Sequence, residues 1–162
     1  MTPSPLTLRE LFPRDRIRTD LASVDKETLF QELVDVIAST SPVELDRSEL
    51  LACIMEREAL MSTGIRAGVA VPHGKSGSVD KLFGAIGISK AGIDYDAGDG
   101  KPVYLAFMIV SPRRNPEVHL QTLKLLAEAL ELAGFAEALI QAADSDAAFH
   151  VIEKFEGLLG CA

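Results

Sequence analysis

Residues 103–110 of this 162-residue chain read VYLAFMIV, a run in which nearly every side chain is apolar. Such a strand is typical of a sheet covered on both faces, because neither side of the strand then has to face water. A second run of β-branched and aromatic residues lies upstream at residues 82–89, and Asp99-Gly100 marks a turn between the two runs. These residues therefore predict two strands separated by a turn.

Two amphipathic helices are predicted upstream of these strands. Val24–Ser39 has apolar residues at helical spacing and places Asp25 at the N-cap position. The next helix is expected to begin at Asp46 and to run to about Glu58. Its predicted apolar face consists of Leu50, Leu51, Ile54 and Met55. Residues 62–77 contain four glycines and a proline, so a shaped loop around a short strand is expected there.

Helical patterns return after the second strand. Asn115 is the expected N-cap of the next helix and Pro116 its first residue. The predicted buried stripe of this helix consists of Leu120, Leu123, Leu126, Ala127 and Leu130. Gly134 ends it, and two further helices are expected at Phe135–Ala142 and at about Asp146–Leu159. The order of elements predicts an α/β fold, a central mixed β-sheet flanked by helices on both faces.

Length and composition limit the classes of protein that fit. A chain of 162 residues suits one domain over residues 1–162, with residues 1–6 expected to be flexible. The net charge of -8 opposes binding to nucleic acid or to anionic lipid. No apolar run approaches the roughly 20 residues needed to cross a bilayer, so a cytoplasmic protein is expected. Cys53 and Cys161 are far apart in the sequence and suggest neither a disulfide nor a zinc site.

One histidine stands out in residues 61–75, which read MSTGIRAGVAVPHGK. Pro72 fixes the approach of the chain to His73, and Gly74 leaves open space beside the ring. A neutral imidazole can attack phosphorus and release the phosphoryl group again at neutral pH. His73 is therefore the predicted nucleophile, and the alternative is a ring that only satisfies the backbone of its loop.

Three further side chains favour the nucleophile over that alternative. His119 lies in the first turn of the helix that begins at Pro116, where backbone N–H groups attract anions. Arg57 offers a planar fork that matches phosphate, and Lys75 adds a cation close to His73. Together these residues predict a site that binds a phosphoryl group.

A known family shows the same pattern of residues. The Ser62–Ile65 segment followed by Gly68–Lys75 resembles the active-site signature of the fructose/mannitol-type enzyme IIA domains of the bacterial phosphotransferase system. The resemblance extends to Arg57-Glu58 and to His119-Leu120, and it covers the chain from Leu8 to about Leu158. It implies the same α/β fold, with a central mixed sheet flanked by helices.

The resemblance also implies roles for individual residues. His73 would be the phosphorylated residue, His119 the second active-site histidine and Arg57 a ligand of the phosphoryl group. The residues expected to bind phosphate or to support the site are Ser62, Thr63, Lys75 and Glu58. The resemblance implies a histidine-phosphorylated carrier protein (HPr or its nitrogen-branch paralogue) as donor. Regulated protein targets or an enzyme IIB cysteine would be acceptors, with no metal and no organic cofactor.

Within that family the chain looks most like the nitrogen-regulatory branch, which acts on partners through its phosphorylation state. This similarity rests on the free-standing length, on Asp94–Ala97 and on Gly100–Val103. Arg66-Ala67 departs from the usual Gly-Asn, so Arg66 is expected near the phosphate or the donor. Arg113-Arg114 is a second departure, interpreted as a solvated pair in a loop, and His150 is expected at the surface or in packing.

Other functions remain open at this stage. The same residues would serve a transport protein that passes phosphate to an enzyme IIB cysteine during sugar uptake. A hydrolase or metal enzyme using His73, His119 and Glu58 is a further alternative, although no metal-ligand spacing supports it. The third alternative is an inert binding module that kept the fold.

Overall fold

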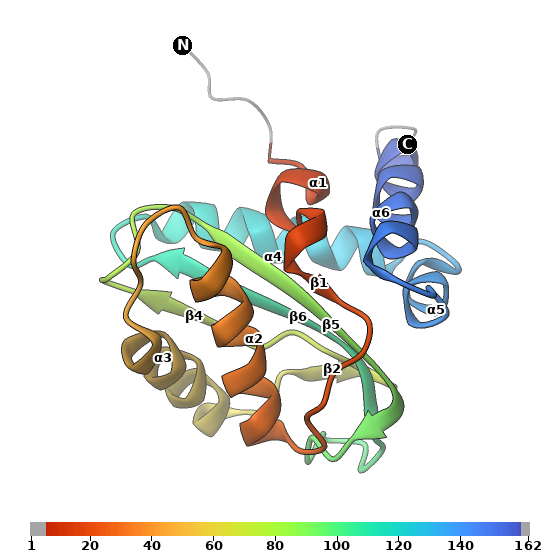
Figure 1. The fold of residues 1–162 in the computed structure, drawn as a ribbon, viewed down its shortest axis with the longest axis horizontal. Helices are drawn as coiled ribbons and strands as arrows, with labels where there is room; N and C mark the ends of the chain where they lie inside the picture. The colour runs from red at the N-terminus through yellow and green to blue at the C-terminus, as the bar shows by residue number, and fades with distance from the viewer. Residues whose placement is uncertain (1–5, 160–162) are drawn as a thin grey trace.

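The structure is a computed structural model that describes residues 6–159, except the side chains of Ile65 and Arg66 (Figure 1). The flexibility expected for residues 1–5 and any role of Cys161 lie outside the described residues. The helices of the protein are α1 (Leu8–Leu11), α2 (Lys26–Thr40), α3 (Arg47–Leu60), α4 (Pro116–Leu130), α5 (Phe135–Ile140) and α6 (Ser145–Leu159), with a 3-10 turn at Arg14–Arg16. Its strands are β1 (Ile17–Arg18), β2 (Gly64–Arg66), β3 (Val69–Ala70), β4 (His73–Ser76), β5 (Phe83–Ile93) and β6 (Val103–Pro112).

These strands form one mixed sheet. Its order is β1-β5-β6-β3-β2, and β4 pairs with β6 beyond the end of β3. The long strands β5 and β6 are antiparallel, with Ile86 opposite Phe107. Strands β3 and β4 run parallel to β6, and β1 runs parallel to β5. The predicted central mixed sheet is therefore confirmed.

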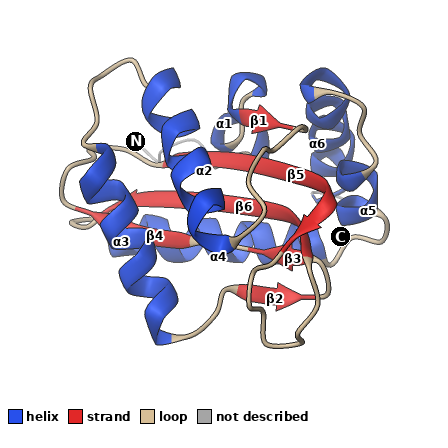
Figure 2. Cartoon of the chain, turned by 60° about the horizontal axis from the view of Figure 1, so that its bottom comes forward, coloured by secondary structure: helices blue, strands red, loops and turns tan. Residues whose placement is uncertain are grey.

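Helices cover both faces of this sheet (Figure 2). Helices α2 and α3 enclose one core with alternate residues of β6, and α1, α4, α5 and α6 enclose the other core. The β6 side chains of the first core are Val103, Ala106, Met108 and Val110, and those of the second are Leu105, Phe107 and Ile109. Because successive side chains of a strand point to opposite faces, the apolar run of β6 fills both cores.

The predicted helix starts are confirmed by capping contacts. The Asp25 side chain accepts a hydrogen bond from the backbone N–H of Thr28. In the same way Asp46 accepts from the N–H of Glu49, and Asn115 accepts from the N–H of Val118. These bonds satisfy N–H groups that have no partner within the helix.

Several details of the sequence interpretation are wrong. Leu120 is 67% exposed and Ala127 is exposed, whereas the buried residues of α4 are His119, Thr122, Leu126, Ala129 and Leu130. The helix is thus rotated by about one residue from the predicted stripe, and its leucine-rich sequence fits either orientation. Met55 of α3 is also exposed. The loop expected at residues 62–77 contains three short strands, and α1 and β1 are too short to have been predicted.

None of the described helices has the length and apolar character needed to cross a membrane.

Candidate active site

His73 is the first residue of β4 and lies opposite Ile109 of β6. Side chains alternate along this strand, so His73 and Lys75 face one way, and Gly74 and Ser76 face α3. Ser76 hydrogen-bonds the Glu49 carboxylate of α3, which fixes the strand to the helix. The strand thus presents His73 and Lys75 on the side away from α3.

Gly74 allows β4 and α3 to approach closely. A Cβ atom at this position would lie 2.8 Å from Cys53 Sγ and 3.0 Å from the Cys53 carbonyl carbon and oxygen. Cys53 is a buried thiol, and burial raises its pKa to about 12. Cys53 therefore acts as a packing residue beneath the strand.

We expect the substitution Gly74→Ala to destabilise the protein, because the added methyl group meets the Cys53 main chain. Overpacking of this kind lowers the free energy of unfolding by about 1–3 kcal/mol. Gly157→Ala in α6 is the matched control, since a Cβ there meets nothing within 4 Å. Urea denaturation of both variants measures the difference, and equal stability of the two would contradict the close packing of β4 on α3.

The two histidines predicted at the site lie side by side. The ring centroids of His73 and His119 are 5.3 Å apart, and the ring planes are inclined by 48°. His119 comes from the first turn of α4, where it is buried. The rotation of α4 that exposes Leu120 is the one that turns His119 towards His73.

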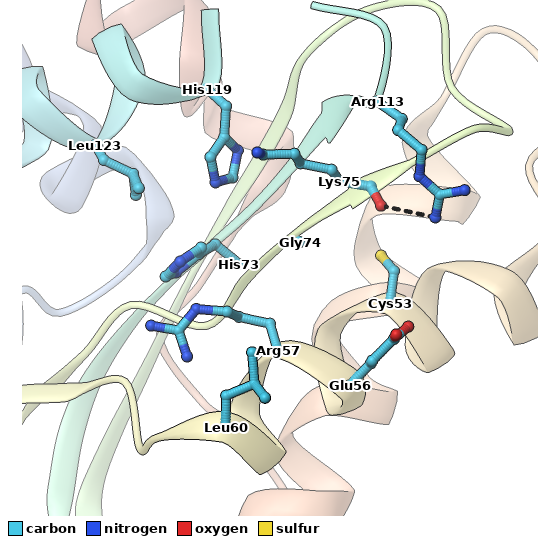
Figure 3. Close-up of a pocket in the computed structure, with 10 residues that line it drawn as sticks. All are labelled: Cys53, Glu56, Arg57, Leu60, His73, Gly74, Lys75, Arg113, His119 and Leu123. Atoms are coloured by element: carbon cyan, nitrogen blue, oxygen red, sulfur yellow. Dashed lines mark hydrogen bonds between the residues drawn. The ribbon is translucent and has the colours of Figure 1, made fainter. Parts of the chain in front are cut away.

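Both rings border one cavity of about 430 Å³ between α3, β4 and α4 (Figure 3). Its lining consists of Cys53, Glu56, Arg57, Leu60, His73, Gly74, Lys75, Arg113, His119 and Leu123. Three of these side chains are cationic and one is a carboxylate. The cavity therefore suits an anionic group beside His73.

The hydrogen bond of His73 fixes its tautomer. Nδ1 lies 2.7 Å from the carbonyl oxygen of Val71, which can only accept, so Nδ1 carries the proton. Burial lowers the pKa of His73, and the nearby Arg57 and Lys75 cations act in the same direction, against the Val71 carbonyl and Glu58. The ring is therefore neutral at neutral pH, with the lone pair on Nε2.

His119 is held by a residue that the sequence analysis did not identify. Its Nδ1 lies 2.7 Å from the hydroxyl of Ser111, a wholly buried residue of β6. Burial lowers the pKa of His119 to about 4, and His73, Lys75 and Arg57 contribute to the shift. When the Ser111 hydroxyl donates to Nδ1, Nε2 carries the proton and can donate to an anion in the cavity.

The cations around the cavity are held in different ways. Arg57 donates from Nη1 to the carbonyl oxygen of Met61 at 3.0 Å, which orients its guanidinium at the end of α3. Arg113 is an exposed residue of the turn after β6, as interpreted, and it also lines the cavity and donates to the Lys75 carbonyl oxygen at 3.5 Å. Its neighbour Arg114 pairs instead with the exposed Asp80.

The remaining predicted site residues lie outside the lining of the cavity. Glu58 and Thr63 hydrogen-bond each other in a buried cluster, and Ser62 accepts a hydrogen bond from the N–H of Gly64. The Arg66 side chain lies outside the described part of the structure, so its expected contact stays a prediction. His150 is exposed on α6, as expected.

Some lining residues could not be identified from the sequence. Leu60 and Leu123 are apolar residues of ordinary helices, and only the spacing of Leu123 from His119 on α4 hinted at a common face. Among the described residues, no group of three or more His, Cys, Asp or Glu side chains could hold a metal ion. The reactive group in the cavity is the neutral imidazole of His73, and the cations Arg57, Lys75 and Arg113 line the cavity around it.

Comparison with known proteins gives a consistent set of relatives. Residues 10–155 match the family model described as phosphoenolpyruvate-dependent sugar phosphotransferase system, EIIA 2. The fructose-specific EIIABC component of Bacillus subtilis is 32% identical over 93% of this chain, which spans 24% of that protein's length. The fructose-specific EIIA component of Haloferax volcanii is 35% identical over 80% of this chain and 84% of its own. A nitrogen regulatory protein of Pseudomonas aeruginosa is 26% identical over 91% of this chain and 95% of its own.

Solved structures share the fold. The nitrogen regulatory protein IIA-Ntr of Neisseria meningitidis superposes with a TM-score of 0.79 at 29% identity, covering 88% of this chain and 97% of that one. The IIA mannitol protein of Escherichia coli has a TM-score of 0.72 at 18% identity, over 85% of this chain and 96% of that one. The second likeness concerns the fold alone.

Proposed function

This chain belongs to the type 2 EIIA family of the phosphoenolpyruvate-dependent sugar phosphotransferase system, whose members are phosphotransferase components, and on this basis we propose that it is a phosphohistidine relay protein. His73 accepts a phosphoryl group from a histidine-phosphorylated carrier protein, and the phosphorylation state then regulates partner proteins. The observation that carries this proposal is a neutral His73 in a cation-lined cavity beside His119.

The acceptance step uses Nε2 of His73 as the nucleophile. Its lone pair attacks the phosphorus of the donor phosphohistidine, and a new P–N bond forms. The P–N bond of the donor breaks, and its electron pair returns to the donor ring nitrogen. The proton on Nδ1 of His73 stays in place and continues to donate to the Val71 carbonyl oxygen. No proton has to leave the ring before attack.

The cavity supports this step by stabilising charge on the phosphoryl oxygens. Arg57 provides two N–H groups in one plane, and Nε2 of His119 provides a third donor when Ser111 holds the required tautomer. Lys75 adds a cation on the same side of β4 as His73. These groups are fixed by α3, α4 and β4 before the donor arrives, so little reorganisation is needed.

Phosphorylation would also change the surface that partners meet. Leu60 and Leu123 border the cavity, and Leu60 is 81% exposed. A phosphate ester carries about -1.5 to -2 charge units at pH 7, and a comparable group on His73 would lie beside this apolar rim. A protein partner docked on the rim can therefore distinguish the two states.

Incubation with phosphoenolpyruvate, enzyme I and a carrier protein tests the proposal. Mass spectrometry should find one acid-labile phosphoryl group, and peptide mapping should assign it to His73. The same mixture without enzyme I is the control. If the chain remains unmodified while the carrier becomes phosphorylated, the relay assignment is wrong.

The second candidate function is sugar transport, which the fructose-specific relatives at 32% and 35% identity favour. In this case His73 would pass its phosphoryl group to an enzyme IIB cysteine. A solved complex of enzyme IIAMTL with phosphorylated enzyme IIBMTL from Escherichia coli has the same fold in its IIA component. Rapid transfer from the phosphorylated chain to purified IIB domains would select transport over a purely regulatory role.

A further inference from the structure

A buried polar cluster around Glu58 of α3 lies outside the lining of the cavity. Glu58 is 8% exposed, and its carboxylate accepts hydrogen bonds from the Thr63 N–H at 3.0 Å and from the Thr63 hydroxyl. The Tyr95 hydroxyl donates to the same carboxylate at 3.1 Å, and Lys26 Nζ lies 3.1 Å from it. Every member of this cluster thus contacts Glu58.

Glu58 is charged in this cluster. Burial alone would raise the pKa of its carboxyl group, but the hydrogen bonds from Thr63 and the ammonium group of Lys26 outweigh burial, so the pKa lies below the ordinary value. A buried ion pair is weak evidence for stability, because apolar groups of similar size often stabilise a protein as much. Stability alone therefore does not explain this cluster, whereas a role in fixing the residues bonded to Glu58 would.

Two hydrogen bonds, one between main-chain groups and one from the His73 ring to a main-chain carbonyl, connect the cluster to the nucleophile. The Thr63 carbonyl oxygen accepts from the Val71 N–H at 2.9 Å. The Val71 carbonyl oxygen in turn accepts from Nδ1 of His73 at 2.7 Å. The path from Glu58 to His73 thus runs through Thr63 and Val71. Each of these two residues donates a hydrogen bond from its N–H towards Glu58 and accepts one at its C=O from the side of His73.

This path transmits position more than charge. At Thr63 and at Val71 the N–H and the C=O belong to different peptide groups, so polarisation of one does not pass directly to the other. What Glu58 fixes is the location of Thr63, and therefore the register of Val71 and the direction of its carbonyl. Its neighbour Arg57 reaches the cavity from the same end of α3.

Building on the relay function proposed above, we propose that Glu58 is a positioning residue for phosphoryl transfer. Through Thr63 and Val71 it keeps the Val71 carbonyl opposite Nδ1 of His73, so that the proton stays on Nδ1 and Nε2 faces the incoming phosphorus. The C-terminal end of α3 then carries both Arg57, which binds the phosphoryl group, and Glu58, which fixes the position of His73.

Ring nitrogen chemical shifts of His73 in the unphosphorylated protein test this directly. In the wild type, ¹⁵N NMR at a pH where the ring is neutral should report the Nδ1–H tautomer. In Glu58→Ala we expect a mixture of tautomers, as in a free imidazole. We also expect kcat for phosphoryl acceptance to fall about tenfold or more with KM for the carrier unchanged, since a shift of about 1 Å can cost 10²-fold.

Two further variants keep the test decisive. Tyr95→Phe removes a hydroxyl that lies 3.1 Å from Glu58 and 2.7 Å from the Thr63 hydroxyl, but it leaves both Thr63 hydrogen bonds to Glu58, so the tautomer and the rate should stay near wild type. If Glu58→Ala does not fold, Glu58→Leu with Thr63→Val replaces the polar pair by apolar groups of similar size, with the same shifts expected. A wild-type tautomer in either folded Glu58 variant would overturn the proposal.

The outcome does not depend on the relay function. The tautomer is measured without any phosphoryl donor, so a wild-type protein that accepts no phosphate would refute the proposed function and leave the positioning result intact. Conversely, normal phosphorylation of a Glu58 variant with a wild-type tautomer would refute only the positioning role.

Discussion

Replacing His73 with alanine should leave a folded protein that takes up no phosphoryl group from the carrier. In the proposed mechanism Nε2 of His73 is the atom of this chain that bonds to phosphorus, and removing a nucleophile costs roughly six orders of magnitude in rate. The fold should tolerate the change, because the ring lies half-buried at the edge of the cavity. Mass spectrometry after incubation with the phosphorylated carrier measures the result.

His150→Ala is the matched control for this experiment. His150 is exposed on α6 and does not line the cavity, so its replacement should leave phosphorylation unchanged. Phosphate on the His73→Ala variant, at the stoichiometry of the wild type, would show that another residue is the acceptor.

Replacing Arg57 with alanine should slow phosphoryl acceptance by about 10²–10³-fold, the cost of removing one fixed donor from a developing oxyanion. Arg57 lines the cavity with His73, and its guanidinium is oriented by the Met61 carbonyl. Lysine at this position should recover only part of the rate, because an ammonium group cannot bind two oxygens in one plane. Rapid-quench measurement of single-turnover transfer gives the rates.

Arg114→Ala is the appropriate control, since Arg114 pairs with Asp80 and does not line the cavity. It removes the same charge without removing a residue of the cavity lining. If both arginine variants slowed transfer equally, the effect would come from net charge and not from a fixed contact of Arg57.

Local patterns predicted the elements of this fold well. The apolar run of β6 is covered on both faces, and Asp25, Asp46 and Asn115 cap the helices as expected. These predictions depend on neighbouring residues only. The prediction for α4 was less accurate, because a helix rich in leucine can bury either of two overlapping stripes, and only packing on the sheet selects one.

The candidate site was predicted only in part, because packing between distant segments decides which side chains share a cavity. His73, His119, Arg57 and Lys75 line one cavity, as the sequence analysis expected of a shared site. Glu58 and its partner Thr63 belong instead to a buried cluster outside the cavity lining, since the consecutive helix residues Arg57 and Glu58 point in directions about 100° apart. Arg113 and Ser111 carried no local signal of their roles, because a charged loop residue and a serine in a strand are ordinary.

The sequence by itself determined the order of the longer helices and strands, the caps and the burial of β6, since side-chain period and capping chemistry act over a few residues. Only the tertiary structure decided that His119 and not Leu120 faces the sheet, that its ring lies 5.3 Å from His73, and that the Val71 carbonyl holds the proton on Nδ1. Those features depend on how distant segments pack and pair, and local periodicity does not encode the relative rotation and register of such segments.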